Sequence, residues 1–304
     1  MQNHLLTLLE WTTQDIKKTL ELAKSSKENP LDYRPLEGKS IALYFEKPSL
    51  RTITTFQVGI HQLGGQVIQL DKSSIGLGKR ESIEDVSRCL SRWIHGLVVC
   101  CFDQELIEKL SQNTNFPIIN ALTDDFHPCQ ALALAQTLDE HWKGQLQGKT
   151  LVFVGDGNNV AISIAIIAAH LGMNFCLSHP DGYAIPTKIL TQVESVFEDK
   201  KSEFYIEQDP RKAVSKANLI YADVWASMGQ EDETEKRAEI FAPYQVNQEL
   251  VDLAPEGCLV SHCLPAHRGE EITSEVVDAD YCVCFDEAEN RLHAQKGVLR
   301  YLYS

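Results

Sequence analysis

Along most of the chain, short apolar runs alternate with segments in which apolar positions recur at helical spacing. Strands are expected where the runs are short and bounded by polar residues, at residues 40–45, 66–70, 96–102 and 117–122. Helices are expected between and after them, at residues 52–63, 83–93, 104–110 and 128–141. The first 25 residues are also expected to form a helix, capped by Thr12 or Thr13, with Ile16, Leu20 and Ala23 on one face.

A polar stretch at residues 141–149 interrupts this rhythm and is the expected domain junction. Beyond it, strands are expected at residues 150–155, 175–179, 204–207, 219–224, 258–264 and 281–285, and helices at 160–171, 188–197, 211–216 and 291–302. Strands that alternate with helices predict a parallel sheet covered by helices. The pattern therefore predicts an α/β protein of two domains, each a mainly parallel sheet flanked by helices, and 304 residues suffice for two domains.

Composition narrows the class of protein. Hydrophobic residues make up 43% of the chain and charged residues 23%, as in ordinary globular proteins. The formal net charge of −15 argues against a nucleic-acid-binding surface, which would be basic. No run approaches the roughly 18 apolar residues of a membrane span. The N-terminus lacks the layout of a signal peptide, so a cytoplasmic protein with reduced cysteines is expected.

Ligands of parallel α/β sheets bind beyond the carboxyl ends of the strands, so the residues after each strand carry the candidate chemistry. After the first strand, the sequence EKPSLRT at residues 46–52 leads directly into a helix. Its hydroxyls, backbone N–H groups and guanidinium suit a phosphate. The alternative is an N-capped helix with a solvated arginine, and the motif alone does not decide between the two.

Two further motifs lie at helix starts. His127 and Gln130 follow the fourth strand, where the histidine could donate to a carbonyl oxygen and the glutamine could contact an amide. Taken alone, a capped helix with a structural histidine is the favoured interpretation. Arg291 opens the terminal helix, and there the alternative is a surface salt bridge.

The fifth strand runs into GDGNNV at residues 155–160, which resembles half of a dinucleotide-binding fingerprint. Val160 takes the place of the third glycine, and the next strand ends without the acidic residue that binds ribose, although Asp181 lies just beyond it. Two adjacent asparagines, Asn158 and Asn159, suit a carboxylate or an amino group better than a pyrophosphate. A nicotinamide cofactor is therefore not expected.

Asp223 emerges at the end of another expected strand, where a carboxylate can pair with a substrate ammonium. Ser227 and Met228 precede Gly229 in a segment expected to be a mobile loop, and the charged residues 231–239 that follow are expected to be solvated.

His262, Cys263 and His267 together suggest a zinc site. However, His262 and Cys263 are neighbours on an expected strand, so their side chains should point to opposite faces of the sheet. No metal site is expected.

Each of these motifs is weak alone, but their order resembles that of the ornithine carbamoyltransferases from about residue 40 to the C-terminus. The series is Ser-x-Arg-Thr, HPCQ, GDGNN, DVWASMG, HCLPAHRGE and FDEAENRLHAQK. The resemblance implies transfer of the carbamoyl group from carbamoyl phosphate to the side-chain amine of L-ornithine, giving L-citrulline and phosphate in arginine metabolism. It implies a carbamoyl-phosphate domain at residues 1–142, completed by a terminal helix at 290–304, an ornithine domain at 143–289, a homotrimer, and no metal or cofactor.

The same resemblance implies the residue roles. The carbamoyl-phosphate set consists of Ser49, Leu50, Arg51, Thr52, His127, Gln130, Cys263, Leu264 and Arg291. The ornithine set consists of Asn159, in preference to Asn158, together with Asp223, Ser227 and Met228. Arg51, His127 and Cys263 form the catalytic set, in which Cys263 is the candidate proton acceptor.

The chain departs from the family pattern in the carbamoyl-phosphate half. Leu50 replaces a common threonine, Ile53 a usual arginine, Gly76 a frequent glutamine, and Cys100 an arginine that contacts the carbamoyl oxygen. Losing one such preorganised donor is worth about 3 kcal/mol of barrier, or roughly a hundredfold in rate. The alternative function is therefore a catalytically weak or altered-specificity paralogue, with a related amine substrate or a binding or regulatory role. Lys79, Arg80 and Arg92 are the candidates for a compensating charge.

Overall fold

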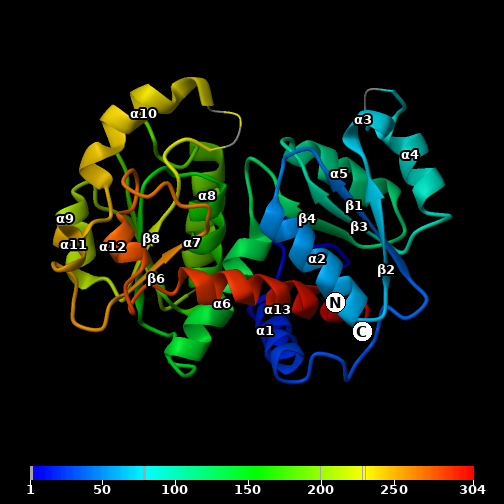
Figure 1. Cartoon of the computed structure of the whole chain (residues 1–304), viewed down its shortest axis with the longest axis horizontal. Helices are drawn as coiled ribbons and strands as arrows, with labels where there is room; N and C mark the ends of the chain where they lie inside the picture. Colours follow the sequence, from blue (N-terminus) through cyan, green and yellow to red (C-terminus); the bar gives the residue numbers. More distant parts are fainter. Residues whose placement is uncertain (1–2, 78–79, 199, 228, 230) are drawn as a thin grey trace. The chain divides into compact units, whose positions relative to one another are not determined.

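The computed structural model describes residues 3–77, 80–198, 200–227, 229 and 231–304. The chain forms two compact units: the first runs up to Gln136 and includes Glu289–Ser304, and the second is Thr137–Ala288. Each unit contains one parallel sheet with helices around it (Figure 1), which confirms the predicted α/β class. The unit boundaries fall inside two helices, α6 (Pro128–His141) and α13 (Cys284–Leu302). The assignment of one substrate to each domain stays a prediction.

The sheet of the first unit has the strand order β2-β1-β3-β4, and all pairs are parallel. Its strands are β1 (Ser40–Phe45), β2 (Gln66–Leu70), β3 (Gly96–Cys100) and β4 (Ile118–Leu122). The helices are α1 (Thr13–Glu28), α2 (Leu50–Gln62), α3 (Lys72–Ile75), α4 (Ile83–Leu90) and α5 (Gln104–Asn113), with parts of α6 and α13. β3 is buried along its whole length because helices cover both faces of the sheet.

Local sequence explains where these helices lie. In α2 the buried residues Thr52, Phe56, Gly59 and Ile60 recur at helical spacing and form one stripe. α1 begins after Thr12, whose hydroxyl accepts from the backbone N–H of Asp15 in a capping box.

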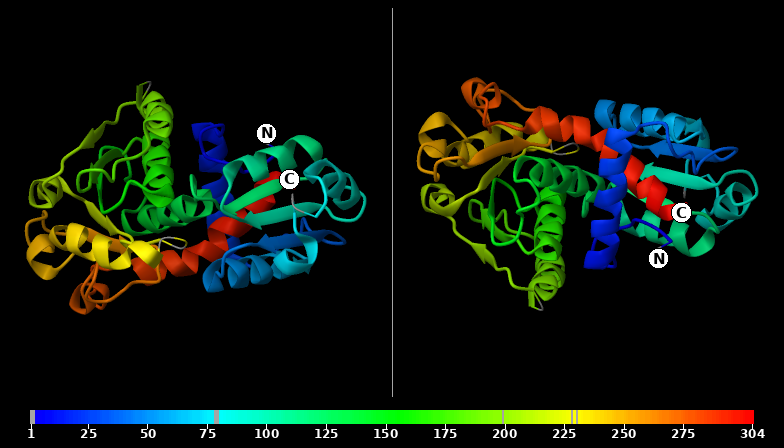
Figure 2. Two further views of the ribbon diagram at one scale, coloured as in Figure 1. Left: turned by 90° about the horizontal axis from the view of Figure 1, so that it is seen from above. Right: turned by 90° about the horizontal axis from the view of Figure 1, so that it is seen from below.

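The terminal helix α13 packs against α1 in the first unit, as the right-hand view of Figure 2 shows for the red and blue helices. A Cβ added at Gly297 would lie 2.6 Å from the carbonyl oxygen of Thr19, so the two helices touch backbone to backbone. Lys296 is fully buried next to this contact and donates to the carbonyl oxygens of Ser26 and Pro30 and to Gln62 Oε1, at 3.2, 3.0 and 2.9 Å. The end of the chain is therefore an integral part of the first unit.

The sheet of the second unit has the order β7-β6-β5-β8-β9, again entirely parallel. Its strands are β5 (Thr150–Val154), β6 (Asn174–Ser178), β7 (Phe204–Ile206), β8 (Leu219–Ala222) and β9 (Leu259–His262). Its helices are α7 (Asn159–Leu171), α8 (Thr187–Glu198), α9 (Pro210–Ala213), α10 (Thr234–Phe241), α11 (Gln248–Val251) and α12 (Ser274–Val277), with 3-10 turns η1 (Val214–Lys216), η2 (Glu231–Glu233) and η3 (Ala242–Tyr244).

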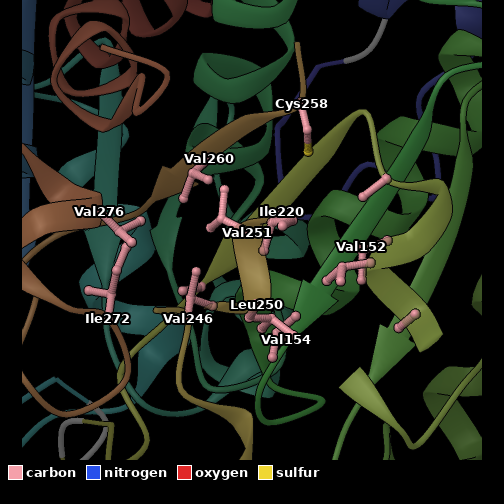
Figure 3. Packing of buried hydrophobic residues seen from close by; sticks show 14 of the residues in the cluster. Val152, Val154, Ile220, Val246, Leu250, Val251, Cys258, Val260, Ile272 and Val276 are labelled. Carbon is pink, nitrogen blue, oxygen red and sulfur yellow. The ribbon is translucent and has the colours of Figure 1, made fainter. Parts of the chain in front are cut away.

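Two cores hold the second sheet. On one face, side chains of β5, β8 and β9 pack with those of α11 and α12; Figure 3 labels Val152, Ile220, Val260, Leu250 and Val276 among them. On the other face lies α7, which is apolar all round and buried from Val160 to Leu171. Gly172 ends α7 in the left-handed region, with φ of 74°.

Some expectations from the sequence were wrong. Residues 281–285 do not form a strand: only one isolated bridge joins Cys282 to Val260, and α13 already begins at Cys284. The apolar run was misleading because Val283 and Cys284 bury their side chains in a turn and a helix start, whereas Phe285 is exposed. Residues 3–11 are not helical either, since α1 begins at Thr13, and instead Leu5 pairs with Ile119 of β4. The charged residues 231–239 include a buried arginine, Arg237, on α10.

Candidate functional site

In the first unit, the candidate residues follow β1, β3 and β4, which are neighbours in the sheet. Because the strands are parallel, their carboxyl ends lie at one edge. Ser49 is the N-cap residue of α2, but within the described part of the chain its hydroxyl makes no hydrogen bond to the first turn. The interpretation of this serine as an ordinary helix cap is therefore not supported, and the helix N-terminus presents its positive end with a hydroxyl beside it.

Arg291 brings three of the predicted residues together. Its guanidinium donates from Nη2 to Thr52 Oγ1 at 2.9 Å and from Nη1 to Gln130 Oε1. All three side chains are buried, although they come from α2, α6 and α13. The alternative interpretation of Arg291 as a surface salt-bridge residue was wrong, since its side chain is 3% exposed.

His127 is buried at the start of α6. Burial lowers the pKa of its imidazole well below the usual value, and the charges of Arg291 and Lys47 lower it further. The ring is therefore neutral at physiological pH, with one nitrogen able to donate a hydrogen bond and the other able to accept one. A neutral donor of this kind suits a carbonyl oxygen.

Lys47 is a site residue that reasoning from the sequence missed. Its side chain is buried, its ammonium pairs with Asp124, and its Nζ lies 4.3 Å from the centre of the Phe102 ring. It follows β1 by two residues, so a charge directly after a buried strand was the available signal. Of the compensating cations proposed from the sequence, Arg80 and Arg92 are exposed, and Lys79 lies outside the described residues.

The departures from the family pattern can also be located. Cys100 is 1% exposed at the end of β3. Burial raises the pKa of its thiol to about 11, although the charges of Lys47 and Arg291 act in the opposite direction, so the group is a neutral thiol. Leu50 is 77% exposed, so only its backbone faces the helix start, while Ser49, Arg51 and Ile53 are half-buried. Gly76 has φ of 54°.

In the second unit, the ends of β5, β8 and β9 carry a chain of hydrogen bonds. Asn158 Nδ2 donates to Asp223 Oδ2 at 2.7 Å, and Cys263 Sγ donates to Asp223 Oδ1 at 2.7 Å. The backbone N–H of Val224 also donates to Asp223 Oδ1, at 2.8 Å. These strands are adjacent in the sheet, so the predicted residues Asp223 and Cys263 are brought together as expected for a site at strand ends.

The two asparagines of the GDGNN motif have different positions. Asn158 is the N-cap of α7, and its Oδ1 accepts from the N–H groups of Val160 and Ala161 at 3.0 and 3.1 Å. Asn159 is the first residue of α7 and is half-buried. Asn158 thus has structural contacts at both ends of its amide, which favours Asn159 as the contact for a ligand.

The remaining predicted residues lie close to this group in the chain. Leu264, directly after Cys263, has φ of 55°, which is unusual for a residue other than glycine and marks a constrained turn. Ser227 is half-buried, and Met228 lies outside the described residues.

The zinc interpretation can be tested against the contacts of His262. The expectation that His262 and Cys263 point to opposite faces was wrong, because β9 ends at His262 and the Cys263 Sγ lies 3.9 Å from His262 Nδ1. Both ring nitrogens are nevertheless engaged: Nδ1 accepts from the N–H of Leu264 at 2.8 Å, and Nε2 lies 3.0 Å from Glu271 Oε1. Nδ1 is therefore the acceptor, and His262 has no nitrogen left for a metal.

Among the described residues, the group with metal-ligand spacing is His267, Glu270 and Glu271, whose ligand atoms lie within 4.8 Å of one another. His267 and Glu270 are exposed, and such groups are common without an ion, so we assign no metal to them. Within the same part of the chain, no helix is both long and apolar enough to cross a membrane.

Comparison with known proteins gives matches over nearly the whole chain. The family model described as aspartate/ornithine carbamoyltransferase, carbamoyl-P binding domain, matches residues 3–140, and that of the Asp/Orn binding domain matches residues 147–302. The ornithine carbamoyltransferase of Thermococcus kodakarensis is 46% identical over 297 residues, which are 97% of this chain and 94% of that protein. The solved structure of ornithine carbamoyltransferase from Pyrococcus furiosus has a TM-score of 0.93 and 43% identity, and the match covers 98% of this chain and 96% of that one.

Proposed function

Because the chain belongs to the aspartate/ornithine carbamoyltransferase family, we propose that it transfers the carbamoyl group of carbamoyl phosphate to the side-chain amine of L-ornithine. Membership confirms the resemblance inferred from the order of the motifs. The observation that carries the choice of an amine substrate is the buried Asp223 carboxylate, held by Asn158 and Cys263 at the ends of adjacent strands. The named relatives are ornithine carbamoyltransferases, which supports ornithine as the amine.

The first unit supplies the binding groups for carbamoyl phosphate. The N-terminus of α2, with the hydroxyls of Ser49 and Thr52 and the guanidinium of Arg51, holds the phosphate; helix ends and arginine forks are suited to this. Arg291, already oriented by Thr52 and Gln130, adds a second cation, which is buried.

The carbamoyl carbonyl requires a donor as negative charge builds on its oxygen. The neutral His127 donates to this oxygen, and Gln130 contacts the carbamoyl amide. Donors fixed in advance lower the barrier because they need no rearrangement as the charge develops. The buried contacts of Gln130 with Arg291 provide that rigidity.

The second unit supplies the ornithine site. Asp223 pairs with the α-ammonium group, and Asn159, Ser227 and Met228 hold the α-amino and α-carboxylate ends together with it. Leu264 lies beside the reacting amine, and its constrained backbone keeps Cys263 in place.

In the reaction, a bond forms between the side-chain nitrogen of ornithine and the carbamoyl carbon, and the bond from that carbon to the phosphate oxygen breaks. Phosphate leaves with the electron pair of the broken bond. The attacking amine must lose a proton, and Cys263 Sγ takes it up as its own thiol proton passes to Oδ1 of Asp223. Much of the rate comes from holding the two substrates in attack geometry.

The same family suggests a homotrimer, a cytoplasmic location and a role in arginine biosynthesis, and we include these in the proposal. Exposed apolar side chains on the first unit, among them Trp93 at 67% and Phe102 at 39%, are groups that such an assembly would cover.

Purified protein incubated with ornithine and labelled carbamoyl phosphate tests the activity. We expect labelled citrulline, and its absence at high enzyme concentration would contradict the proposal. Putrescine and Nα-acetylornithine serve as competing amines in the same assay. Preference for either would support the altered-specificity paralogue instead. Asp223→Asn is the matched variant, which should raise the KM for ornithine more than that for carbamoyl phosphate.

A further inference from the structure

A buried arginine on α10 connects two turns of the second unit. Arg237 is 6% exposed, although it lies in a strongly charged segment. Its Nη1 donates to Asp156 Oδ2 at 2.7 Å and to the carbonyl oxygen of Trp225 at 2.9 Å. Its Nε donates to Glu233 Oε2 at 2.9 Å, and its guanidinium carbon lies 4.9 Å from the centre of the Tyr183 ring.

Two of the partners of Arg237 lie within three residues of the proposed ornithine contacts. Asp156 lies in the turn between β5 and α7, three residues before Asn159, and Trp225 follows Asp223 by two residues. One guanidinium therefore ties the turn that carries the asparagines to the segment that carries the carboxylate. Both ties are hydrogen bonds to a buried cation, which are among the stronger kinds.

The turn between β5 and α7 is also held by contacts other than the one with Arg237. A Cβ added at Gly157 would lie 2.4 Å from the backbone nitrogen of Ile185, and the N–H of Gly157 donates to the carbonyl oxygen of Tyr183 at 2.9 Å. Tyr183 in turn packs edge-on against Phe241 of α10. Arg237 thus packs beside residues that already fix the turn of Asp156, and it links that turn to the segment of Trp225.

The positive charge of Arg237 also acts on the neighbouring carboxylate of Asp156. Burial raises the pKa of the Asp156 carboxyl and the nearby charge of Asp223 raises it too, whereas the guanidinium of Arg237 lowers it. Two carboxylates thus lie near one another, and within the described part of the chain Asp156 is the one of the two that pairs with an arginine. An incoming ammonium group is directed to Asp223, because the charge of Asp156 is already balanced.

We infer that Arg237 is a positioning residue for ornithine, which fixes the turn before Asn159 relative to the segment that carries Asp223 and neutralises the competing Asp156. This inference rests on the proposed function, because it concerns recognition of the same substrate. A purely structural arginine would affect stability and both substrates alike, so the separate KM values distinguish the two roles.

The test compares Arg237→Met with Arg237→Lys in steady-state kinetics of the full-length protein. We expect Arg237→Met to raise the KM for ornithine by about tenfold to a hundredfold, while the KM for carbamoyl phosphate changes less than about twofold. Arg237→Lys should recover part of the loss, because it keeps the charge but offers one ammonium in place of the separate Nη1 and Nε donors of the guanidinium. Equal changes in both KM values, or an unchanged KM for ornithine, would overturn the inference.

The matched control is Arg268→Met. Arg268 also forms a two-pronged ion pair in the second unit, with Asp278 at 2.6 and 2.7 Å, but its side chain is 38% exposed. We expect neither KM to change in this variant. Glu233→Gln removes only the exposed partner of Arg237 and should also leave both values unchanged.

Arg237→Met leaves the Asp156 carboxylate buried and unpaired, which could prevent folding. The double variant Asp156→Asn/Arg237→Met removes that charge and should still show the raised KM for ornithine, since the tie to Trp225 is lost. If the unaltered protein forms no citrulline, the proposed function fails, and calorimetric binding of ornithine to the unaltered protein and to Arg237→Met then decides the inference. Equal affinity in both would overturn it.

Discussion

Cys100 shows how a single side chain changes the chemistry expected of a strand end. The thiol is buried and protonated, and the charges of Lys47 and Arg291 act on it. A neutral thiol is only a weak hydrogen-bond donor. Compared with the arginine that the resemblance implies at this position, the site has one charged donor fewer.

We expect Cys100→Arg to raise kcat/KM for carbamoyl phosphate by up to about a hundredfold, since one fixed donor is worth about that much. Steady-state kinetics at saturating ornithine measures the effect. Cys100→Ser is the control, because it changes the atom without adding charge, and it should leave the rate nearly unchanged. If Cys100→Arg is slower but unfolds at the same temperature as the unaltered protein, the prediction is wrong and the site requires the thiol of Cys100.

His127 gives a prediction for stability against pH. Its pKa in the folded protein lies well below the unfolded value of about 6.5. Below that pH the unfolded chain binds the proton first, so the free energy of unfolding falls as the pH drops. The unfolding free energy of the unaltered protein minus that of His127→Gln should therefore be smaller at pH 5.5 than at pH 7.5, by at most about 1.4 kcal/mol per pH unit.

Urea unfolding at the two pH values measures this difference. A constant difference for His127→Gln would mean that the imidazole is not kept neutral by burial.

The candidate residues were predictable where a motif follows a strand. Asp223 and Cys263 lie in contact because β8 and β9 are neighbours, which the motif positions already suggested. Lys47 and Arg237 were not found, because a lysine in a turn and an arginine among charged residues look like solvated side chains. Only the packing shows that both are buried.

Among the elements, α13 shows what a helix contributes beyond its own sequence pattern. Residues 291–302 were expected to be helical, but the helix begins at Cys284. The extra turns carry Glu287, which is buried and accepts from Tyr221 Oη at 2.8 Å and from Ser261 Oγ at 2.5 Å. Such long-range contacts are invisible to local periodicity, whereas strands such as β3 and β5 were found because they are short, largely apolar runs.

Gly297 permits the close contact between α13 and α1. A methyl group there would meet the Thr19 carbonyl oxygen at 2.6 Å and the Ala23 Cβ at 2.8 Å, and neither backbone nor a packed alanine yields easily. We expect Gly297→Ala to lower the free energy of unfolding by about 1–3 kcal/mol, the usual range for overpacking. Chemical denaturation measures the loss.

Gly59→Ala in α2 is the matched control. Its added Cβ would lie 3.2 Å from Cγ of Lys296, a long side chain that can shift by a few tenths of an ångström. Since alanine also favours the helix, its effect should be near zero or stabilising. A loss at Gly59 equal to that at Gly297 would mean that helix contact is not the cause.

At the scale of the whole molecule, exposed apolar side chains are the available sign of assembly. Trp93 is 67% exposed on the first unit, and Phe285 is 57% exposed on the second. If copies of the chain contact one another through their first units, as the family resemblance implies, Trp93 should affect the assembly and Phe285 should not. A charge placed in such a contact is costly because it would be buried without a partner.

Light scattering after size-exclusion chromatography tests this. We expect the unaltered protein to have three times the mass of the 34.2 kDa chain, and Trp93→Lys to shift the population toward smaller species. Phe285→Lys should leave the mass unchanged. A shift with Phe285→Lys alone would place the contact on the second unit instead.

The amide of Asn158 has its oxygen on the first turn of α7 and its nitrogen on Asp223. Turning this amide over by half a rotation would set its NH₂ group against two N–H groups and its oxygen against a carboxylate, so both ends would repel at once. An aspartate of the same shape at this position would keep the helix start but oppose Asp223. The helix start thereby selects the orientation in which the amide presents its N–H to Oδ2 of Asp223.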